Sequence, residues 1–415
     1  MFYTNVFQRG KKIYVKGYDK GLRFKKVVDY KPYLFVSKAD NKGDYKTIDN
    51  KPVDKIQFDS IPDARNFCEL YEGVSNMKIY GLNNFKYLYI YDNFKGDISY
   101  DPAVINIVTL DIECAADEGF PSIKEADKEI TAITLRSRGR SFVFGCGKFI
   151  TDDPNIHYLQ CQDEYELIQK FIKAWNVLDI DIITGYNTEF FDIPYLVNRI
   201  TRLFNEKEAK KLSPYGIIDE KTVEFRGKEN QSFVIAGISS LDYYQLYRKF
   251  TFGNQESYKL DYISQVELGE KKVDYSEYGS LLELYKNNYQ KFIEYNIYDC
   301  ILVDRLEEKL GFIQQVLTLA YDAKVNYNDT LTTILPWDII IHNYLMDKKI
   351  VIPPMSGHRM EKDLVGGYVK DPKIGLSKWI VSLDAKSMYP SNIMQYNISA
   401  DTQITKSYLL GLLNE

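Results

Sequence analysis

The chain of 415 residues has little of what disulfide frameworks and most transition-metal sites are built from. It contains five cysteines and three histidines, and no two cysteines form a Cys-x-x-Cys pair. Such dispersed cysteines argue against a disulfide framework and against a zinc ribbon. So few histidines argue against a histidine-rich metal centre. Any bound metal would therefore be held mainly by carboxylates, which favours hard ions such as Mg²⁺ or Mn²⁺.

Long apolar runs are also missing. No stretch reaches the ~18 consecutive apolar residues that a membrane-spanning helix needs. The first residues, Met-Phe-Tyr-Thr-Asn-Val, lack the charged-then-apolar order of a signal peptide. We therefore expect no membrane partner and a cytoplasmic location.

Positive charge is not in excess, since the formal net charge is −5 at pH 7. This balance excludes a uniformly basic duplex-binding protein, but it leaves room for a local nucleic-acid surface. Between Arg9 and Lys26, basic residues face a single acid, Asp19. This basic stretch is either a solvated strand surface or part of such a contact. Its basic residues are Arg9, Lys11, Lys12, Lys16, Lys20, Arg23, Lys25 and Lys26.

The length suits roughly two to four domains. Short strands and turns fill the first hundred residues, and from Val104 the pattern changes to a β-branched run, Val-Ile-Asn-Ile-Val-Thr-Leu-Asp-Ile-Glu, which is typical of a buried central strand. Strands followed by alternating helices and strands predict an α/β sheet domain covered by helices. We expect strands over 130–135, 142–145, 180–184 and 378–384, a hairpin over 223–237, and helices over 63–71, 164–175, 192–204, 281–310 (one or two) and 387–394.

Asp111 and Glu113 stand at the end of the central strand. The two-residue period of a strand places both carboxylates on one face. Charges at the end of a buried strand are costly unless a metal or a partner compensates them. The same triplet at Asp127-Lys128-Glu129 lies in a hydrophilic loop. The alternative for Asp111 and Glu113 is a strand that simply emerges into water.

Two further carboxylates have ambiguous surroundings. Asp192 precedes Pro194 at an expected helix start, so it is either a helix cap or a site residue. Asp299 follows Tyr295 by four residues on an expected helix, and the two therefore share a face. The alternative for Asp299 is an exposed helical acid above a packed tyrosine.

The four acids are more informative when they are considered together with the residues around them than when each is considered alone. The segments "LDIE", "GYNTEFFDIPYLVNR" and "YNIYD" resemble, in order, the three exonuclease motifs of family B DNA polymerases, among them the replicative enzymes of T-even-type bacteriophages. "YKPYLF", the segment 241–264 and "SLDAKSMYPSNIMQYNIS" support the resemblance, which spans nearly the whole chain. It implies an α/β and α+β multidomain fold. Its expected domains are a mixed β N-terminal domain (1–103), an RNase H-like exonuclease domain (104–312), a helical segment returning to the N-terminal domain (313–355), and a linker with an incomplete polymerase palm (356–415).

The resemblance also implies a 3′→5′ exonuclease that uses two divalent ions, Mg²⁺ or Mn²⁺. Asp111, Glu113, Asp192 and Asp299 would hold the ions, and Tyr295 would orient the attacking water. The substrate would be a DNA 3′ end, single-stranded or in a primer–template. The hairpin would help to part primer from template. The expected DNA contacts near this site are Asn187, Phe190 and Phe191.

Near the end of the chain, Asp384 to Tyr389 resembles the first polymerase motif. The resemblance implies a metal contact for Asp384 and nucleotide contacts for Ser387 and Tyr389. Gly366 and Gly367 would allow close approach to DNA phosphate, although Leu364 stands where the family has Tyr. No second palm carboxylate hairpin or fingers helix follows. We therefore expect no polymerisation by this chain alone, and we expect a second polymerase chain or C-terminal half as partner, with a sliding clamp bound through it.

Two alternatives stay open. One is a stand-alone nuclease of similar fold, against which the palm-like segment argues. The other is a non-catalytic DNA-binding or assembly subunit of a split polymerase, against which the complete carboxylate set argues.

Overall fold

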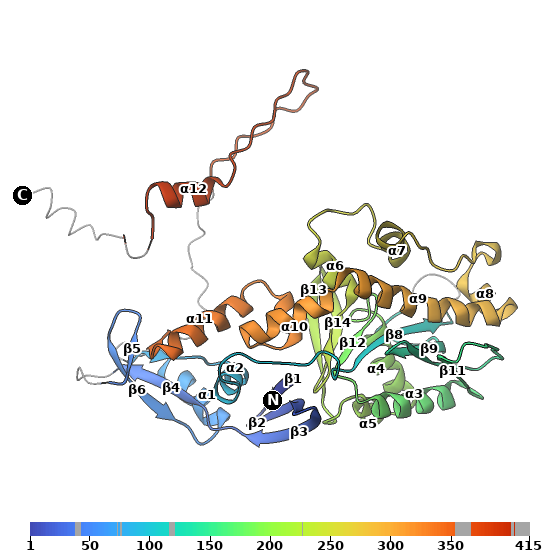
Figure 1. Cartoon of the computed structure of the whole chain (residues 1–415), viewed down its shortest axis with the longest axis horizontal. Helices are drawn as coiled ribbons and strands as arrows, with labels where there is room; N and C mark the ends of the chain where they lie inside the picture. The colour runs from blue at the N-terminus through green and yellow to red at the C-terminus, as the bar shows by residue number, and fades with distance from the viewer. Residues whose placement is uncertain are drawn as a thin grey trace, which may run out of the picture. The chain divides into compact units, whose positions relative to one another are not determined.

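The computed structural model describes residues 1–37, 43–72, 74, 77–115, 121–225, 227–352, 367–399 and 402. The chain forms two compact units, Met1–Ser356 and Gly357–Glu415. Figure 1 gives the course of the chain and the labels of its elements. No helix among the described residues is long and apolar enough to cross a membrane.

The N-terminal part of the first unit contains two small sheets. An antiparallel meander is formed by β1 (Phe2–Arg9), β2 (Lys12–Asp19) and β3 (Leu22–Asp29). A five-stranded sheet has the order β16-β5-β6-β4-β7. Its strands are β4 (Tyr33–Ser37), β5 (Tyr45–Thr47), β6 (Pro52–Gln57), β7 (Ile79–Tyr80) and β16 (Ile350–Val351), and its helices are α1 (Ile61–Tyr71) and α2 (Phe85–Asn93).

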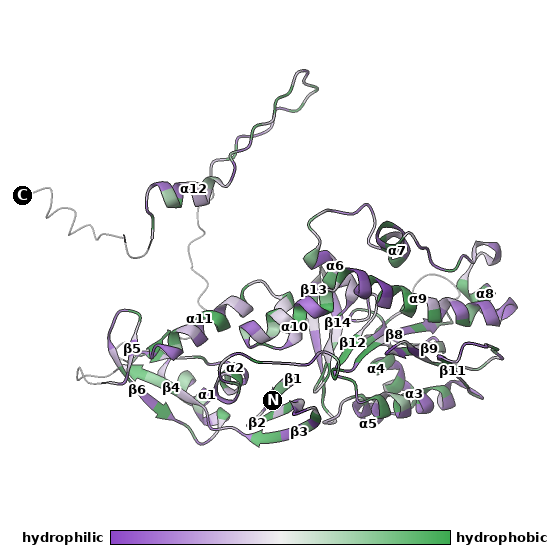
Figure 2. Cartoon of the chain, viewed as in Figure 1, coloured by the Kyte–Doolittle hydropathy of each residue, from purple (hydrophilic) through white to green (hydrophobic). Residues whose placement is uncertain are grey.

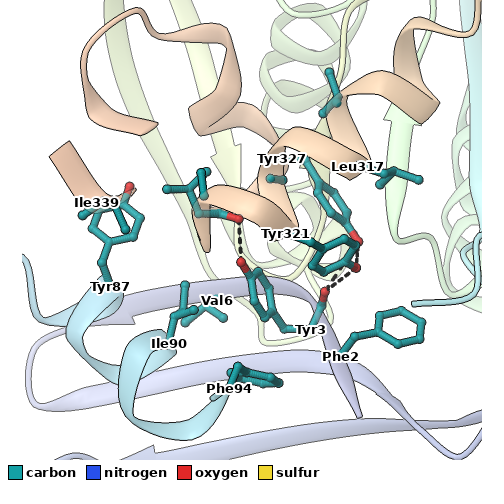
Figure 3. Close-up of a cluster of buried hydrophobic side chains, with 14 of the residues drawn as sticks. Phe2, Tyr3, Val6, Tyr87, Ile90, Phe94, Leu317, Tyr321, Tyr327 and Ile339 are labelled. Carbon is teal, nitrogen blue, oxygen red and sulfur yellow. Dashed lines mark hydrogen bonds between the residues drawn. The ribbon is translucent and has the colours of Figure 1, made fainter. Parts of the chain in front are cut away.

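Residues 312–351 pack back on this N-terminal part, through α10 (Phe312–Ala323), η3 (Tyr327–Leu331), α11 (Leu335–Asp347) and β16. Figure 3 shows the buried cluster that joins them to β1 and α2. The Tyr3 hydroxyl donates to the carbonyl of Val325 at 2.7 Å, and the Tyr321 hydroxyl donates to the carbonyl of Tyr3 at 2.8 Å. The two chain segments are therefore held together by buried polar contacts as well as by apolar packing.

The candidate site rests on a six-stranded sheet with the order β11-β10-β9-β8-β12-β15. Strand β8 is antiparallel to β9 and parallel to β12. Figure 2 colours β8 and β12 as hydrophobic, in line with their central position. The strands are β8 (Ile107–Cys114), β9 (Ile130–Ser137), β10 (Arg140–Gly145), β11 (Ile156–Gln160), β12 (Ile182–Thr184) and β15 (Ser239–Ser240).

Helices cover both faces of this sheet. Val108, Leu110 and Ile112 of β8 pack in one buried cluster with residues of α3 (Glu164–Leu178) and α4 (Asp192–Leu203). The alternate residues of β8 face α9 (Tyr289–Leu310), because the Thr109 hydroxyl donates to Asp304 of that helix at 2.6 Å. The period of two along β8 thus turns Asp111 and Glu113 toward α9.

The remaining elements lie around this core. They are α5 (Glu206–Ala209), η1 (Lys210–Leu212), β13 (Ile218–Phe225), β14 (Lys228–Ile235), α6 (Tyr243–Phe250), α7 (Leu260–Leu268), η2 (Ser276–Tyr278) and α8 (Leu281–Asn287). Strands β13 and β14 pair as one hairpin, which begins five residues before the start expected at 223. The expected helical region 281–310 is divided into α8 and α9.

One expected element is wrong. The segment 378–384 forms no strand, although its β-branched pattern is favourable. Its side chains are exposed, and no strand among the described residues pairs with it. A strand needs a hydrogen-bonded neighbour, so the local pattern is insufficient. The second unit contains α12 (Met388–Gln395), close to the helix expected over 387–394.

Candidate active site

Strand β8 presents Asp111 and Glu113 on the side that faces α9. The Asn296 side-chain amide donates to Asp111 Oδ2 at 2.6 Å, and the Thr134 hydroxyl donates to the carbonyl oxygen of that amide. Thr134 lies opposite Asp111 in the β8–β9 pairing. This chain of hydrogen bonds fixes the Asp111 carboxylate between the sheet and the helix.

Helix α9 contributes Asp299 and Tyr295, one turn apart. Both side chains are buried, with 4% and 7% of their surface exposed. One oxygen atom each from Asp111, Glu113 and Asp299 lies within 4.8 Å of the other two. The two neighbouring acids of β8 therefore meet an acid that is distant from them in sequence.

Asp192 is not one of the three acids whose oxygens meet within 4.8 Å, but its charge acts on Asp111 and it approaches from a different element. It is the first residue of α4, is 3% exposed, and accepts a hydrogen bond at Oδ1 from the backbone N–H of Ile112 at 3.0 Å. That N–H lies between Asp111 and Glu113 in the chain. Phe191, rather than Asp192, is the N-cap residue of α4. The Asp192 carboxylate is thus directed to the sheet and not only to its own helix.

Burial and mutual repulsion disfavour the charged forms of all four acids. Burial, followed by the charges of Asp299, Glu113 and Asp192, holds the pKa of Asp111 well above its usual range. Burial raises the pKa of Glu113 and that of Asp192 to about 8. The pKa of Asp299 is also raised, by burial, although Lys272 opposes this. A close group of buried and partly buried acids with such pKa values is typical of a functional site.

Lys272 is a site residue that sequence reasoning missed. It lies between α7 and η2, and its Nζ forms an ion pair with Asp299 Oδ2 and donates to the Tyr295 hydroxyl at 3.0 Å. Burial lowers the pKa of Lys272, but Asp299 and Tyr295 outweigh burial and the pKa is raised, so the side chain stays charged. The segment Glu-Lys-Lys-Val-Asp has no local signal that marks one lysine as internal.

The donor set fits hard divalent cations. It consists of carboxylate oxygens, which Mg²⁺ and Mn²⁺ prefer. Asp299 Oδ1 is buried and has no hydrogen-bond partner among the described residues. One lysine faces four acids, which leaves a deficit of positive charge that bound cations would offset.

The loop before Asp192 is held rigidly. Asp242, the N-cap residue of α6, accepts hydrogen bonds from the backbone N–H groups of Asn187 at 2.8 Å and Glu189 at 3.1 Å. Burial raises the pKa of Asp242 to about 7. A Cβ at Gly185 would lie 2.4 Å from the carbonyl oxygen of Leu110, so only glycine lets the loop approach β8 this closely.

The aromatic pair beside Asp192 differs in exposure. Phe190 is 7% exposed, whereas Phe191 is partly exposed and stacks on Tyr195 with ring centroids 5.7 Å apart. Asn187 adopts a positive φ of 67° and is partly exposed. Of the expected DNA contacts in this loop, Phe191 and Asn187 therefore present more surface than Phe190.

The expected polymerase residues lie in the second unit. Asp384 is exposed, Ser387 is the N-cap residue of α12 with φ of 50°, and the Tyr389 side chain on that helix is 71% exposed. Among the described residues, no metal-binding group of acids includes Asp384. Gly367 is exposed, and Gly366 lies outside the described residues.

Comparison with known proteins identifies the domain around this site. The family described as DNA polymerase family B, exonuclease domain, matches residues 74–263. This part of the chain is similar to the family B exonuclease domain. The expected resemblance and the RNase H-like α/β fold class are thereby confirmed, and Asp111, Glu113 and Asp192 lie inside the matched region.

Similarity to the family extends beyond the matched domain. The chain is 33% identical to the DNA-directed DNA polymerase of Escherichia phage RB69 and 30% identical to that of Enterobacteria phage T4, in each case over 97% of this chain and 47% of the relative. It is 27% identical to the DNA polymerase catalytic subunit of Elephantid herpesvirus 1, over 74% of this chain and 31% of the relative. The chain thus spans about half the length of the phage polymerases that it resembles.

Proposed function

We propose that this chain removes nucleotides from the 3′ end of DNA, as the proofreading exonuclease portion of a family B replicative DNA polymerase. The observation that carries the proposal is the meeting of Asp111 and Glu113, which lie in the matched exonuclease domain, with Asp299 of α9 within 4.8 Å. The proposed substrate is a single-stranded 3′ end, alone or at a primer–template junction, in the cytoplasm of a phage-infected cell.

The four carboxylates are the proposed ligands of two divalent ions, Mg²⁺ or Mn²⁺. When bound, such ions stabilise charge on the attacking and leaving oxygens of a phosphodiester during in-line displacement. Asp111 is central because the charges of the other three acids, Asp299, Glu113 and Asp192, all act on it. Asp192 holds the backbone between the two strand acids and completes the set.

Tyr295 and Lys272 have separate roles. Burial, followed by the charge of Asp299, raises the pKa of Tyr295 above its usual value, so the hydroxyl keeps its proton at neutral pH. Lys272 donates to the Tyr295 oxygen, and the Tyr295 hydroxyl is hydrogen-bonded to Asp299, so both partners hold this hydroxyl beside the carboxylates, where we propose that it orients the attacking water. The charged Lys272 also offers an electrostatic contact for the scissile phosphate.

The loop and hairpin beside the site supply the proposed DNA contacts. Phe191 offers a partly exposed ring for a terminal base, which contributes roughly 1–3 kcal/mol per stacked base in single-strand binding. The proposed contacts also include Asn187 and Phe190, although Phe190 is buried at 7% exposure. The hairpin β13–β14 is the proposed element that parts primer from template.

Digestion of a 5′-labelled single-stranded DNA tests the proposal. With Mg²⁺ or Mn²⁺ we expect a ladder that shortens from the 3′ end, and with EDTA no shortening. Asp111→Ala should abolish the ladder while the far-UV spectrum is retained. The matched control is Asp127→Ala, because Asp127 stands in the same Asp-x-Glu spacing on an exposed loop. Equal activity of Asp111→Ala and the unchanged chain would refute the proposal.

Polymerisation is a second, separate proposal. Asp384 would bind metal, Ser387 and Tyr389 would contact the incoming nucleotide, and Gly366 with Gly367 would lie near the template. These roles need a second polymerase chain or C-terminal half, and a sliding clamp would bind through that part. Addition of a polypeptide that carries the remaining palm, fingers and thumb should permit primer extension. Extension that is equally efficient with Asp384→Asn would contradict the role of Asp384.

A further inference from the structure

A cavity whose lining includes none of the four carboxylates is left unexplained by the exonuclease. Its volume is about 560 Å³, and it lies where β2 and β3 meet the end of α3, α5 and η1. Figure 1 shows α3 and α5 adjacent to one another. Its apolar lining includes Trp175, Ile180, Leu212 and Ile238, each less than 10% exposed. Its charged lining consists of Lys16, Lys25, Lys207, Lys210, Lys211 and one acid, Asp179.

The single acid of the cavity is already fully engaged. Asp179 Oδ1 forms ion pairs with Lys16 at 3.0 Å, Arg23 at 3.0 Å and Lys25 at 3.1 Å. Asp181, which is completely buried, pairs with Lys16 at 3.2 Å and with Arg23 at 2.8 Å. Three cations thus share two carboxylates, so this network keeps an excess of positive charge. Asp179 therefore has no negative charge left to neutralise the other lysines of the cavity.

The lysines of α5 and η1 add to that excess. Lys207 is exposed and forms no ion pair among the described residues. Lys210 and Lys211 pair with Glu206 and Glu208 of their own helical turns, and neither glutamate lines the cavity. Such surface pairs are worth little and open readily when a stronger acceptor arrives.

We propose that this cavity binds the phosphate of a nucleotide unit, with the lysine side chains on the phosphate and the apolar lining against the sugar or base. Phosphate is the anion that lysine clusters bind best, as a point-charge contact. The volume is within the usual range of small-ligand sites, about 300–1,000 Å³. A free nucleotide and a unit of a single strand share this chemistry. The proposal also involves one residue of the basic stretch, since the partly exposed Lys25 lines the cavity.

Trp175 provides a local reporter of binding. The chain has three tryptophans, and Trp337 and Trp379 are 66% and 98% exposed. Replacement of both by Phe leaves Trp175 as the single emitter, at the cavity wall. The probes are dATP, a twelve-nucleotide oligothymidylate and inorganic phosphate, each titrated in EDTA so that the DNA is not degraded. We expect a saturable change in Trp175 emission with dATP or with the oligonucleotide.

The test variant is Lys207→Glu/Lys210→Glu, and the matched control is Lys170→Glu/Lys173→Glu. The test pair lines the cavity, whereas the control pair on α3 lines a neighbouring hollow instead. We expect the test variant to bind the nucleotide probes at least about tenfold more weakly. The slope of the logarithm of affinity against the logarithm of salt concentration should be smaller by about two. The control should bind like the parent chain. Exonuclease activity on single-stranded DNA should persist in both variants. The substrate class proposed for the cavity rests on the proposed function, and this activity measurement distinguishes failure of the cavity proposal from failure of the proposed function.

Binding of dATP assigns a nucleotide site, and binding of the oligonucleotide alone assigns a contact along a single strand. An emission change produced equally well by inorganic phosphate would refute nucleotide recognition. No change with any probe, or equal weakening in the two double variants, would also overturn the proposal.

Discussion

Two groups of buried or partly buried acids lie on the same sheet domain and have opposite electrostatic balance. Asp179 and Asp181 are matched by Lys16, Arg23 and Lys25, all supplied by the meander β1–β3. Among the described residues, Lys272, paired with Asp299, is the one cation that forms an ion pair with Asp111, Glu113, Asp192 or Asp299. The first group therefore completes its charge within the chain and joins two parts of the fold.

The difference in pKa follows the difference in partners. Burial alone would raise the pKa of Asp179, but Lys16, Lys25 and Arg23 outweigh it and the pKa is lowered. For Glu113 and Asp192, burial raises the pKa to about 8. Buried acids with built-in cations stabilise the fold, whereas buried acids without them are arranged for cations from solution.

The largest expected effect concerns activity. Asp299→Asn keeps the shape of the side chain but removes one negative ligand, and we expect nuclease activity to fall on the order of 1,000-fold or more. The melting temperature without metal should stay equal or rise, because a repelled buried charge is lost. Digestion of labelled DNA and thermal unfolding in EDTA measure the two quantities. If Asp299→Asn lost much of its stability without metal but kept full activity, this group of acids would act on stability rather than on catalysis, and the contrast between the two groups would be reversed.

Removal of Asp181 should act on stability instead. Its carboxylate accepts from Tyr18 at 2.8 Å and from the N–H of Asn106 at 2.9 Å in addition to its ion pairs. Asp181→Ala leaves buried cations under-compensated, and we expect a loss of about 3–5 kcal/mol in the free energy of unfolding. Urea unfolding measures this loss. Activity per folded molecule should be unchanged, and a selective loss of activity would contradict a structural role.

The two groups should respond to pH with opposite sign. Glu113 and Asp192 have ordinary pKa values of 4.5 and 3.8 and folded values of about 8, so the folded state binds their protons more tightly. Their contribution to metal-free stability is therefore present below about pH 4 and is lost as the pH rises toward 8. Asp179, with a lowered pKa, contributes above its ordinary value of 3.8 and loses that contribution as the pH falls.

Thermal unfolding in EDTA between pH 5 and 8.5 isolates the first of these effects. We expect the melting temperature to fall across this range by roughly 5 °C or more, and saturating Mn²⁺ to remove most of the fall. Glu113→Gln should flatten the EDTA curve. A metal-free melting temperature that rises with pH would show that the site acids are compensated within the chain.

The smallest expected effect comes from Lys272. Lys272→Met removes the ion pair with Asp299 and the hydrogen bond to Tyr295. We expect the metal-free protein to lose about 1–3 kcal/mol, and the stabilisation by Mn²⁺ to become larger because more repulsion is relieved. Differential scanning calorimetry with and without Mn²⁺ measures both quantities. If Mn²⁺ stabilised Lys272→Met and the unchanged chain equally, Lys272 would have no electrostatic effect on the carboxylates.

Local sequence periods predict the frame of the site well. The two-residue period of β8 places Asp111 and Glu113 on one face, and the four-residue spacing on α9 places Tyr295 above Asp299. Each depends on a single element, whose geometry is fixed by backbone hydrogen bonding. The resemblance to a known family supplied the grouping of the four acids, which no local period contains.

Contacts between distant segments were not predictable in the same way. Lys272 reaches Asp299 because the segment after α7 folds over α9, and its neighbour Lys271 has the same local sequence context. Lys16, Arg23 and Lys25 belong to a stretch that is compatible with a solvated surface, yet they turn toward Asp179 and Asp181 on the sheet domain. The segment 378–384 shows the converse, since a favourable strand pattern forms no strand without a neighbouring strand.

The binding stoichiometry of Mn²⁺ tests the central claim most directly. Calorimetric titration of the intact chain should show two ions bound per molecule. Asp111→Ala should lose at least one of them, and Asp181→Asn, which alters the compensated group, should keep both. Absence of Mn²⁺ binding, or equal binding by Asp111→Ala and the unchanged chain, would contradict the assignment of these four carboxylates as a metal-dependent exonuclease site.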